Sequence, residues 1–175
     1  ATLPSGTLSP TRRVDAYYDP AADSGAGAWI VAPWVELEQA AFVRADRTGS
    51  QTITQNVVTT ITTYSPIVTR FRDPGTTFAS GVLTTGARDA GWWLAAANAE
   101  MGVESGVTLF SYVYKNGNRD AASSNQRSSS GTAYSNAFCL VRLDAGDTLD
   151  GRIFHNHSSS EVMDGFRFMA FRVGN

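Results

Sequence analysis

The chain is poor in the residues that cross-linking and catalysis require. Its 175 residues include one cysteine and two histidines, so no disulfide framework can hold the fold and secretion into an oxidising space is not implied. The sequence contains no G-x-S-x-G elbow, no phosphate-binding glycine loop with lysine, no C-x-x-C and no H-E-x-x-H. We therefore predict a protein that is not an enzyme and that needs no cofactor.

Charge of one sign is also lacking. The 14 basic and 16 acidic residues give a formal net charge of -2, and Lys115 is the only lysine. Without a strong positive field, nucleic acid is not expected as a partner. No apolar run approaches the length that crosses a membrane, so membrane insertion is not expected either. A charged-then-apolar leader is not visible, which predicts synthesis in the cytoplasm.

The second half of the chain is rich in short β-branched and aromatic runs, separated by tight-turn sequences. Helical periodicity hardly interrupts them, and this pattern predicts an antiparallel sandwich. The expected strands cover residues 91–99, 107–114, 137–143, 149–157 and 165–173, and the expected turns cover residues 115–118 and 144–147. A polar stretch at 121–132 and the serine-rich stretch at 158–161 are expected to be surface loops, where recognition is usually placed.

The order of these motifs resembles the C1q/TNF-like jelly-roll family. The motifs are Gly91-Trp92-Trp93-Leu94, Val113-Tyr114-Lys115-Asn116-Gly117, Leu143-Asp144-Ala145-Gly146-Asp147 and Gly165-Phe166-Arg167-Phe168. Residues 51–54, residues 59–64 and Phe78 are similar to the early strands of that family. The resemblance covers residues 42–173 and implies an all-β, two-sheet antiparallel jelly roll at 42–175, preceded by an N-terminal extension at 1–41.

The last strand is apolar on both faces. Phe166, Phe168 and Ala170 alternate onto one face, whereas Met169, Phe171 and Val173 alternate onto the other, where an exposed sheet would carry polar residues. The second face therefore needs a cover. The family resemblance implies that a neighbouring subunit around a three-fold axis supplies it. The alternative cover is the N-terminal segment folded back over its own sheet.

Residues 1–41 have no counterpart in the family pattern. They carry large side chains that an unpartnered arm would not leave in water, namely Tyr17, Tyr18, Trp29, Ile30 and Trp34. We expect this arm to dock, either on its own sandwich or on a partner. Ser9, followed by Pro10, could begin a short helix that runs to Tyr18. Residues 33–42 fit a helix and a strand equally well.

Three small groups of residues remain to be considered: the two histidines, the single cysteine and the strand aromatics. His155 and His157 project to one face if both lie in a strand, so they are a weak candidate metal site, against the plainer interpretation of a solvated or hydrogen-bonded pair. Cys139 lies inside an apolar strand and is expected to be a buried packing residue. The strand aromatics Trp92, Trp93, Tyr112 and Tyr114 could stack on sugars, although such residues more often belong to a core.

The resemblance extends to the jelly-roll modules of bacteriophage tail-tip, fibre and head-decoration proteins. It implies a homotrimeric virion protein that decorates or cements the capsid and contacts the major capsid protein or other virion proteins. The absence of a coiled-coil or repeat shaft favours capsid decoration over a long fibre. Host attachment at a tail tip, through a surface glycan or receptor, is the first alternative. A cellular C1q-like module that binds carbohydrate or protein is the second.

Overall fold

The computed structural model describes residues 16–19, 28–31, 40–126 and 129–174. The chain divides into two units, Ala1–Glu38 and Gln39–Asn175. In the first unit, β1 (Ala16–Asp19) pairs antiparallel with β2 (Ala28–Val31), with Tyr18 opposite Trp29. The expectation of a helix running to Tyr18 is therefore wrong for residues 16–19, because these residues form a strand that pairs with a second β-rich run. Residues 9–15 and Trp34 lie outside the described residues.

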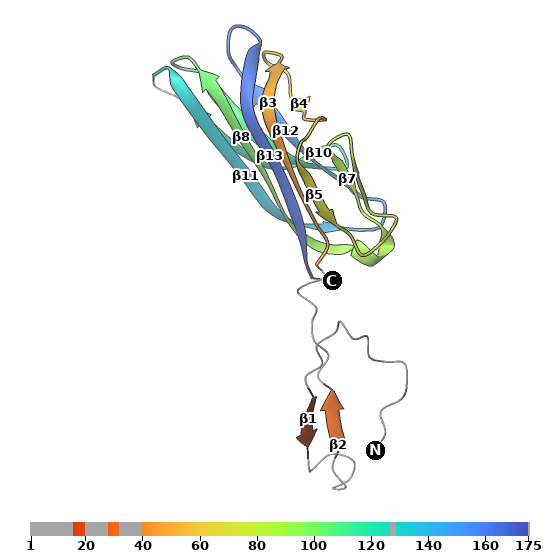
Figure 1. The fold of residues 1–175 in the computed structure, drawn as a ribbon. Coiled ribbons are helices and arrows are strands. Elements are labelled where there is room, and N and C mark those ends of the chain that lie inside the picture. Colours follow the sequence, from red (N-terminus) through yellow and green to blue (C-terminus); the bar gives the residue numbers. More distant parts are fainter. Residues whose placement is uncertain (1–15, 20–27, 32–39, 127–128, 175) are drawn as a thin grey trace. The chain divides into compact units, whose positions relative to one another are not determined.

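The second unit is a sandwich of two antiparallel sheets (Figure 1). The five-stranded sheet has the order β11–β8–β13–β3–β5. Its strands are β3 (Phe42–Ile53), β5 (Ile67–Arg70), β8 (Gly91–Val103), β11 (Gly131–Leu143) and β13 (Glu161–Gly174). The six-stranded sheet has the order β10–β9–β12–β7–β6, and β4 (Thr59–Thr60) pairs with β12. Its other strands are β6 (Thr77–Ala79), β7 (Val82–Thr84), β9 (Thr108–Lys115), β10 (Asn118–Gln126) and β12 (Thr148–His155).

The core lies between the two sheets and is built by alternation along each strand. In β8, the side chains that point inward are buried at every second position from Gly91 to Val103. The largest fully buried side chains include Trp93, Met101, Leu109, Phe168 and Met163. The prediction of an all-β, antiparallel jelly-roll sandwich is thus confirmed. Among the described residues, no helix is long and apolar enough to cross a membrane.

The tight turns follow the sequence prediction. Asn116 and Gly117 both have positive φ, as a two-residue hairpin requires, and they join β9 to β10. The backbone N–H of Asp147 donates to the carbonyl of Asp144, which closes the turn between β11 and β12.

Several boundaries differ from the prediction. Most of the expected loop at 121–132 is strand, because β10 runs to Gln126 and β11 begins at Gly131. Its small alanine and serine residues suffice for an edge strand, since the backbone ladder with β9 provides the pairing. The expected strand at 59–64 contracts to β4, and β3 begins at Phe42 rather than near Gln51.

Candidate functional site

One half of the outer face of the five-stranded sheet is apolar. Leu140, Leu94, Phe171 and Phe42 form one row across β11, β8, β13 and β3. The next row contains Phe138, Ala96 and Met169, and it continues to Arg44. We call these two rows, together with Trp92 and Val173, the apolar face. Its exposed members are Phe138 at 74%, Leu140 at 57%, Val173 at 52%, Phe171 at 44% and Trp92 at 41% of full exposure.

The other half of the same sheet surface is polar. The row beyond Met169 contains Asn136, Asn98, Arg167 and Asp46. The Asp46 carboxylate accepts hydrogen bonds from Arg167 and, at 2.9 Å, from Arg44. Burial alone would raise the pKa of Asp46, but the two guanidinium groups outweigh burial and hold it below its usual value. The sheet surface is therefore divided into an apolar half and a half held by ion pairs.

The apolar face contains the residues that sequence reasoning predicted, and more. Met169, Phe171 and Val173 lie on the outer side of β13, opposite the buried Phe166 and Phe168. Residues Phe138 and Leu140 of β11 were missed. Their signal was present in the sequence, because residues 137–141 are apolar without alternation, as in the last strand.

His155 uses both ring nitrogens inside the fold. It is fully buried, and its Nδ1 accepts the backbone N–H of His157 at 3.2 Å. Its Nε2 lies 3.0 Å from the carbonyl oxygen of Ile53, so Nε2 carries the proton and donates it. This imidazole joins the end of β12 to the end of β3 and has a structural role.

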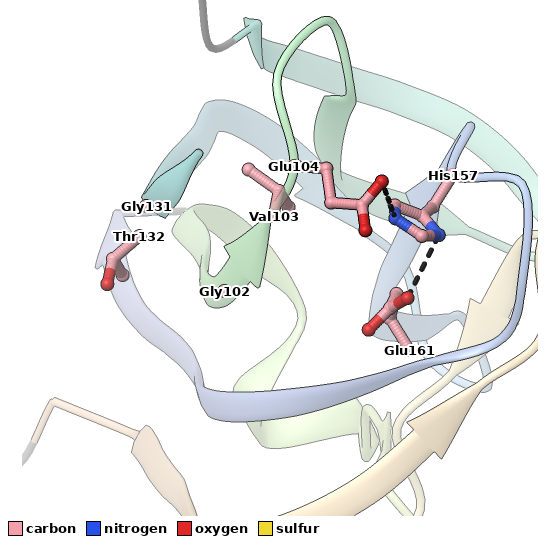
Figure 2. Close-up of a pocket in the computed structure, with 7 residues that line it drawn as sticks. All are labelled: Gly102, Val103, Glu104, Gly131, Thr132, His157 and Glu161. Carbon is pink, nitrogen blue, oxygen red and sulfur yellow. Dashed lines mark ion pairs between the residues drawn. The ribbon is translucent and has the colours of Figure 1, made fainter. Parts of the chain in front are cut away.

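His157 lies between two carboxylates at the edge of a pocket of about 360 Å³ (Figure 2). Its Nε2 is 3.2 Å from Glu104 Oε2, and its Nδ1 is 2.9 Å from Glu161 Oε1. Nδ1 also accepts the backbone N–H of Ser159 at 3.1 Å. Ser159 Oγ in turn donates to Glu161 Oε1 at 3.0 Å. These contacts tie the loop after β12 to the β8–β9 turn.

The two imidazole rings do not point toward one position where both could bind the same ion. The two rings are 6.4 Å apart and tilted by 59°, and each ring has a separate set of partners. Among the residues that the structure describes, no group of three or more histidine, cysteine, aspartate or glutamate side chains is arranged to hold a metal. The candidate metal site at His155 and His157 therefore finds no additional ligand in the described part of the chain.

Cys139 and the strand aromatics are mostly packed. Cys139 is half-buried at the margin of the core, and burial, with a hydrogen bond to Asp120, raises its pKa to about 12. Trp93 is fully buried and donates its indole N–H to the carbonyl oxygen of Asp89. Of the four strand aromatics considered as sugar-stacking candidates, Trp92 is the exposed one, and it lies on the apolar face.

The aromatic residues of β9 lie on the outer side of the six-stranded sheet: cations cover Tyr112 and Tyr114, and Phe110 stacks on Tyr112. Arg119 lies over the ring of Tyr112, and Arg152 lies 3.9 Å from the ring centroid of Tyr114. Arg152 also donates to the buried Asp150 at 2.6 Å. These rings are therefore occupied by intramolecular contacts, and they do not offer a free stacking platform.

Comparisons with known proteins find relatives in structure but not in sequence. No protein-family model matches the chain, and no curated protein matches it. Murine APRIL, in a crystal structure at pH 5.0, has a TM-score of 0.58 and 13% identity, over 77% of this chain and 99% of that one.

Two further solved structures agree. The globular domain of zebrafish complement 1qA has a TM-score of 0.55 and 12% identity, over 77% of this chain and 99% of that one. Eiger TNF from S. frugiperda has a TM-score of 0.51 and 10% identity, over 78% of this chain and 92% of that one. The sandwich therefore has the C1q/TNF-like jelly-roll fold, as the sequence motifs implied, and at these identities the likeness establishes the fold alone.

Proposed function

We propose that this chain is a non-enzymatic structural protein that assembles into a homotrimer by closing the apolar face. The observation that carries the proposal is the contiguity of that face: Phe138, Leu140, Phe171 and Trp92 come from three adjacent strands and are all exposed in the single chain. Exposed apolar patches of this kind mark interaction sites. The family resemblance makes three subunits the expected number.

The polar half of the sheet surface suits such an assembly. Arg44 and Arg167 both pair with Asp46 within the subunit, so each charged group of this cluster already has a partner when a neighbour approaches, although the cluster keeps one net positive charge. The apolar half would supply the favourable free energy of association, and the polar half would supply orientation.

The trimer is proposed to decorate or cement a bacteriophage capsid and to reside in the virion. Support comes from the jelly-roll motifs, the Thr-rich segment at 51–63 and the aromatic N-terminal residues, which would contact the major capsid protein or another virion protein. Host attachment at a tail tip is the alternative within the virion. A cellular C1q-like binding module fits the fold equally well.

The mass in solution tests the assembly. Sedimentation equilibrium of the full chain should give three times its 18.7 kDa across a wide concentration range. A stable monomer mass would contradict the proposal. Co-sedimentation with virus particles that lack the protein then separates a virion protein from a cellular module, because only the virion protein should bind them stoichiometrically.

A further inference from the structure

A pocket of about 320 Å³ in the sandwich unit is lined by three arginines and one phenylalanine. Arg70 ends β5, Phe71 and Arg72 follow it directly, and Arg88 lies in the short 3₁₀ helix η3 (Ala87–Asp89). No acidic residue is among those that line it. Arg70 borders the apolar face through its pairing with Phe42, whereas Arg72 and Arg88 belong to none of its rows.

Asp89 fixes the segment that carries Arg72 against η3. Its carboxylate is fully buried and accepts the backbone N–H groups of Arg72 and Asp73, both at 3.1 Å. The hydroxyl of Thr76 donates to the same carboxylate at 2.7 Å and accepts the backbone N–H of Gly86 at 2.8 Å. Charge-assisted hydrogen bonds of this kind hold two segments from different parts of the sequence in one arrangement.

Asp73 completes this scaffold from the other side. Its carboxylate accepts the backbone N–H groups of Arg88 and Gly75, each at 2.7 Å. These two bonds, assisted by the charge of Arg88, hold the pKa of Asp73 below its usual value. Backbone N–H groups, together with the Thr76 hydroxyl at Asp89, thus occupy the two carboxylates. Among the described residues, no acidic side chain forms an ion pair with the guanidinium of Arg72 or Arg88.

We propose that this pocket binds an acidic saccharide, through a sugar ring that carries a carboxylate or a sulfate. Guanidinium groups from two fixed segments can form paired N–H···O bonds with such an anion. Phe71, which also packs against the core, is the apolar residue of the lining, and the C–H face of a sugar can lie next to it. The volume lies at the small end of ligand pockets and suits one such unit.

The charge distribution favours a saccharide over nucleic acid. Three arginines and two scaffold aspartates lie together in one small region, on a chain whose formal net charge is -2. A phosphate backbone is bound through an extended positive surface, whereas a single anionic sugar needs only a local cluster. The proposal does not depend on the trimer or on the virion assignment.

Calorimetric titration of the full chain tests it with three polymers. Oligogalacturonate carries carboxylates, sulfated dextran carries sulfates and unmodified dextran carries neither. We expect saturable binding to one or both acidic polymers, weakened by added salt, and none to dextran. Which acidic polymer binds more tightly identifies the anion. Binding of dextran as tight as that of the acidic polymers, or no binding of any polymer, would overturn the proposal.

Two single variants locate the site. Arg72→Gln and Arg88→Gln should each weaken binding by about tenfold or more, since each removes hydrogen bonds to a charged group. Arg119→Gln is the control: it removes the same charge from β10, where the arginine covers Tyr112. Circular dichroism and sedimentation should show all three variants folded and assembled as the wild type. If Arg119→Gln loses as much affinity as the pocket variants, binding follows overall charge and the pocket is not the site.

Discussion

Phe138 of β11 and Met169 of β13 lie on either side of Ala96 of β8, in one row across the outer face of the five-stranded sheet. Because Ala96 is smaller than its two apolar neighbours, we expect a large side chain from another subunit to pack over it. Phe138 is 74% exposed, so the single chain leaves most of the ring in water. We therefore expect another subunit to cover this row of the sheet in the proposed assembly.

The first prediction is that a charge on the apolar face dissociates the trimer. Phe138→Asp and Phe171→Asp should each shift the sedimentation mass to that of the monomer, because a carboxylate buried without a partner costs about 3–5 kcal/mol. The monomeric variants should remain folded, since both side chains point away from the core.

A matched control separates assembly from a general loss of hydrophobicity. Val57 is 47% exposed and belongs to the turn after β3, outside the apolar face. Val57→Asp should leave the mass unchanged. If it dissociates the protein, or if neither phenylalanine variant does, the apolar face is not the interface.

Much of this surface could be predicted from the sequence. The doubly apolar last strand identified Met169, Phe171 and Val173, because side chains at i and i+2 of a regular strand share one face. That these residues meet Phe138, Leu140 and Trp92 depends on the strand order β11–β8–β13. Strand order is set by pairing between distant segments, and local periodicity does not contain it.

The second prediction concerns a buried serine pair. Ser135 Oγ accepts the backbone N–H of Ser111 at 3.1 Å, lies 3.0 Å from the Ser111 hydroxyl and donates to the carbonyl oxygen of Ser123 at 2.8 Å. Ser135→Ala leaves these groups without that partner, so urea unfolding should show a loss of about 1–3 kcal/mol. Ser124→Ala, at an exposed position of β10, should change stability far less. Equal losses would contradict a specific role for the pair.

The third prediction is that Cys139 is inert in the native protein. Burial, with the hydrogen bond to Asp120, raises its pKa to about 12, so very little thiolate exists near neutral pH. A maleimide reagent should label the thiol slowly in buffer and rapidly in denaturant. Rapid labelling without denaturant would show that the end of β11 opens readily.

The fourth prediction is a loss of stability in acid. Burial would raise the pKa of Asp147, but hydrogen bonds from Lys115 and Asn116 outweigh it and lower the pKa to about 2. Because the folded value lies below the unfolded value of about 3.9, this contribution is present above about pH 4 and is lost as the pH falls toward 2.

Comparison with Asp147→Asn checks the assignment. The variant should be less stable than the wild type at neutral pH, and the difference between the two should shrink as the pH falls from about 4 to 2. A difference that stays constant over this range would show that the Asp147 carboxylate is not the titrating group.

The contacts of His157 with its two glutamates, and the pocket lined by three arginines, could not be predicted from the sequence. His157 meets Glu104 only because β9 and β12 are neighbours, which brings the β8–β9 turn to the end of β12. Arg72 and Arg88 line one pocket because hydrogen bonds to Asp89 and Asp73 hold together the two segments that carry these arginines. In both cases the residues that come together are far apart in the sequence, so no local spacing predicts their contact. The Asn116–Gly117 turn is formed by adjacent residues, and it was predicted correctly.

The fifth prediction concerns the N-terminal unit. β1 and β2 pair with each other in a two-stranded sheet of the unit Ala1–Glu38. Because the strands of both sandwich sheets all come from the unit Gln39–Asn175, we expect removal of residues 1–38 to leave the thermal midpoint and the trimer mass of the sandwich unchanged. Attachment to the particle should be lost. Tyr17, Tyr18, Trp29, Ile30 and Trp34 are the proposed docking residues, and each could contribute about 1.5–3 kcal/mol when buried on a partner.

The measurements of the truncated chain separate the two proposed roles of this unit. Particles that lack the protein should bind the full chain and not the truncated one, and three arms acting together would make that difference large. Retained binding at full occupancy would assign attachment to the sandwich. A lowered thermal midpoint, or a changed mass, would instead mean that the N-terminal unit covers part of the sandwich, which is the alternative cover for the apolar face.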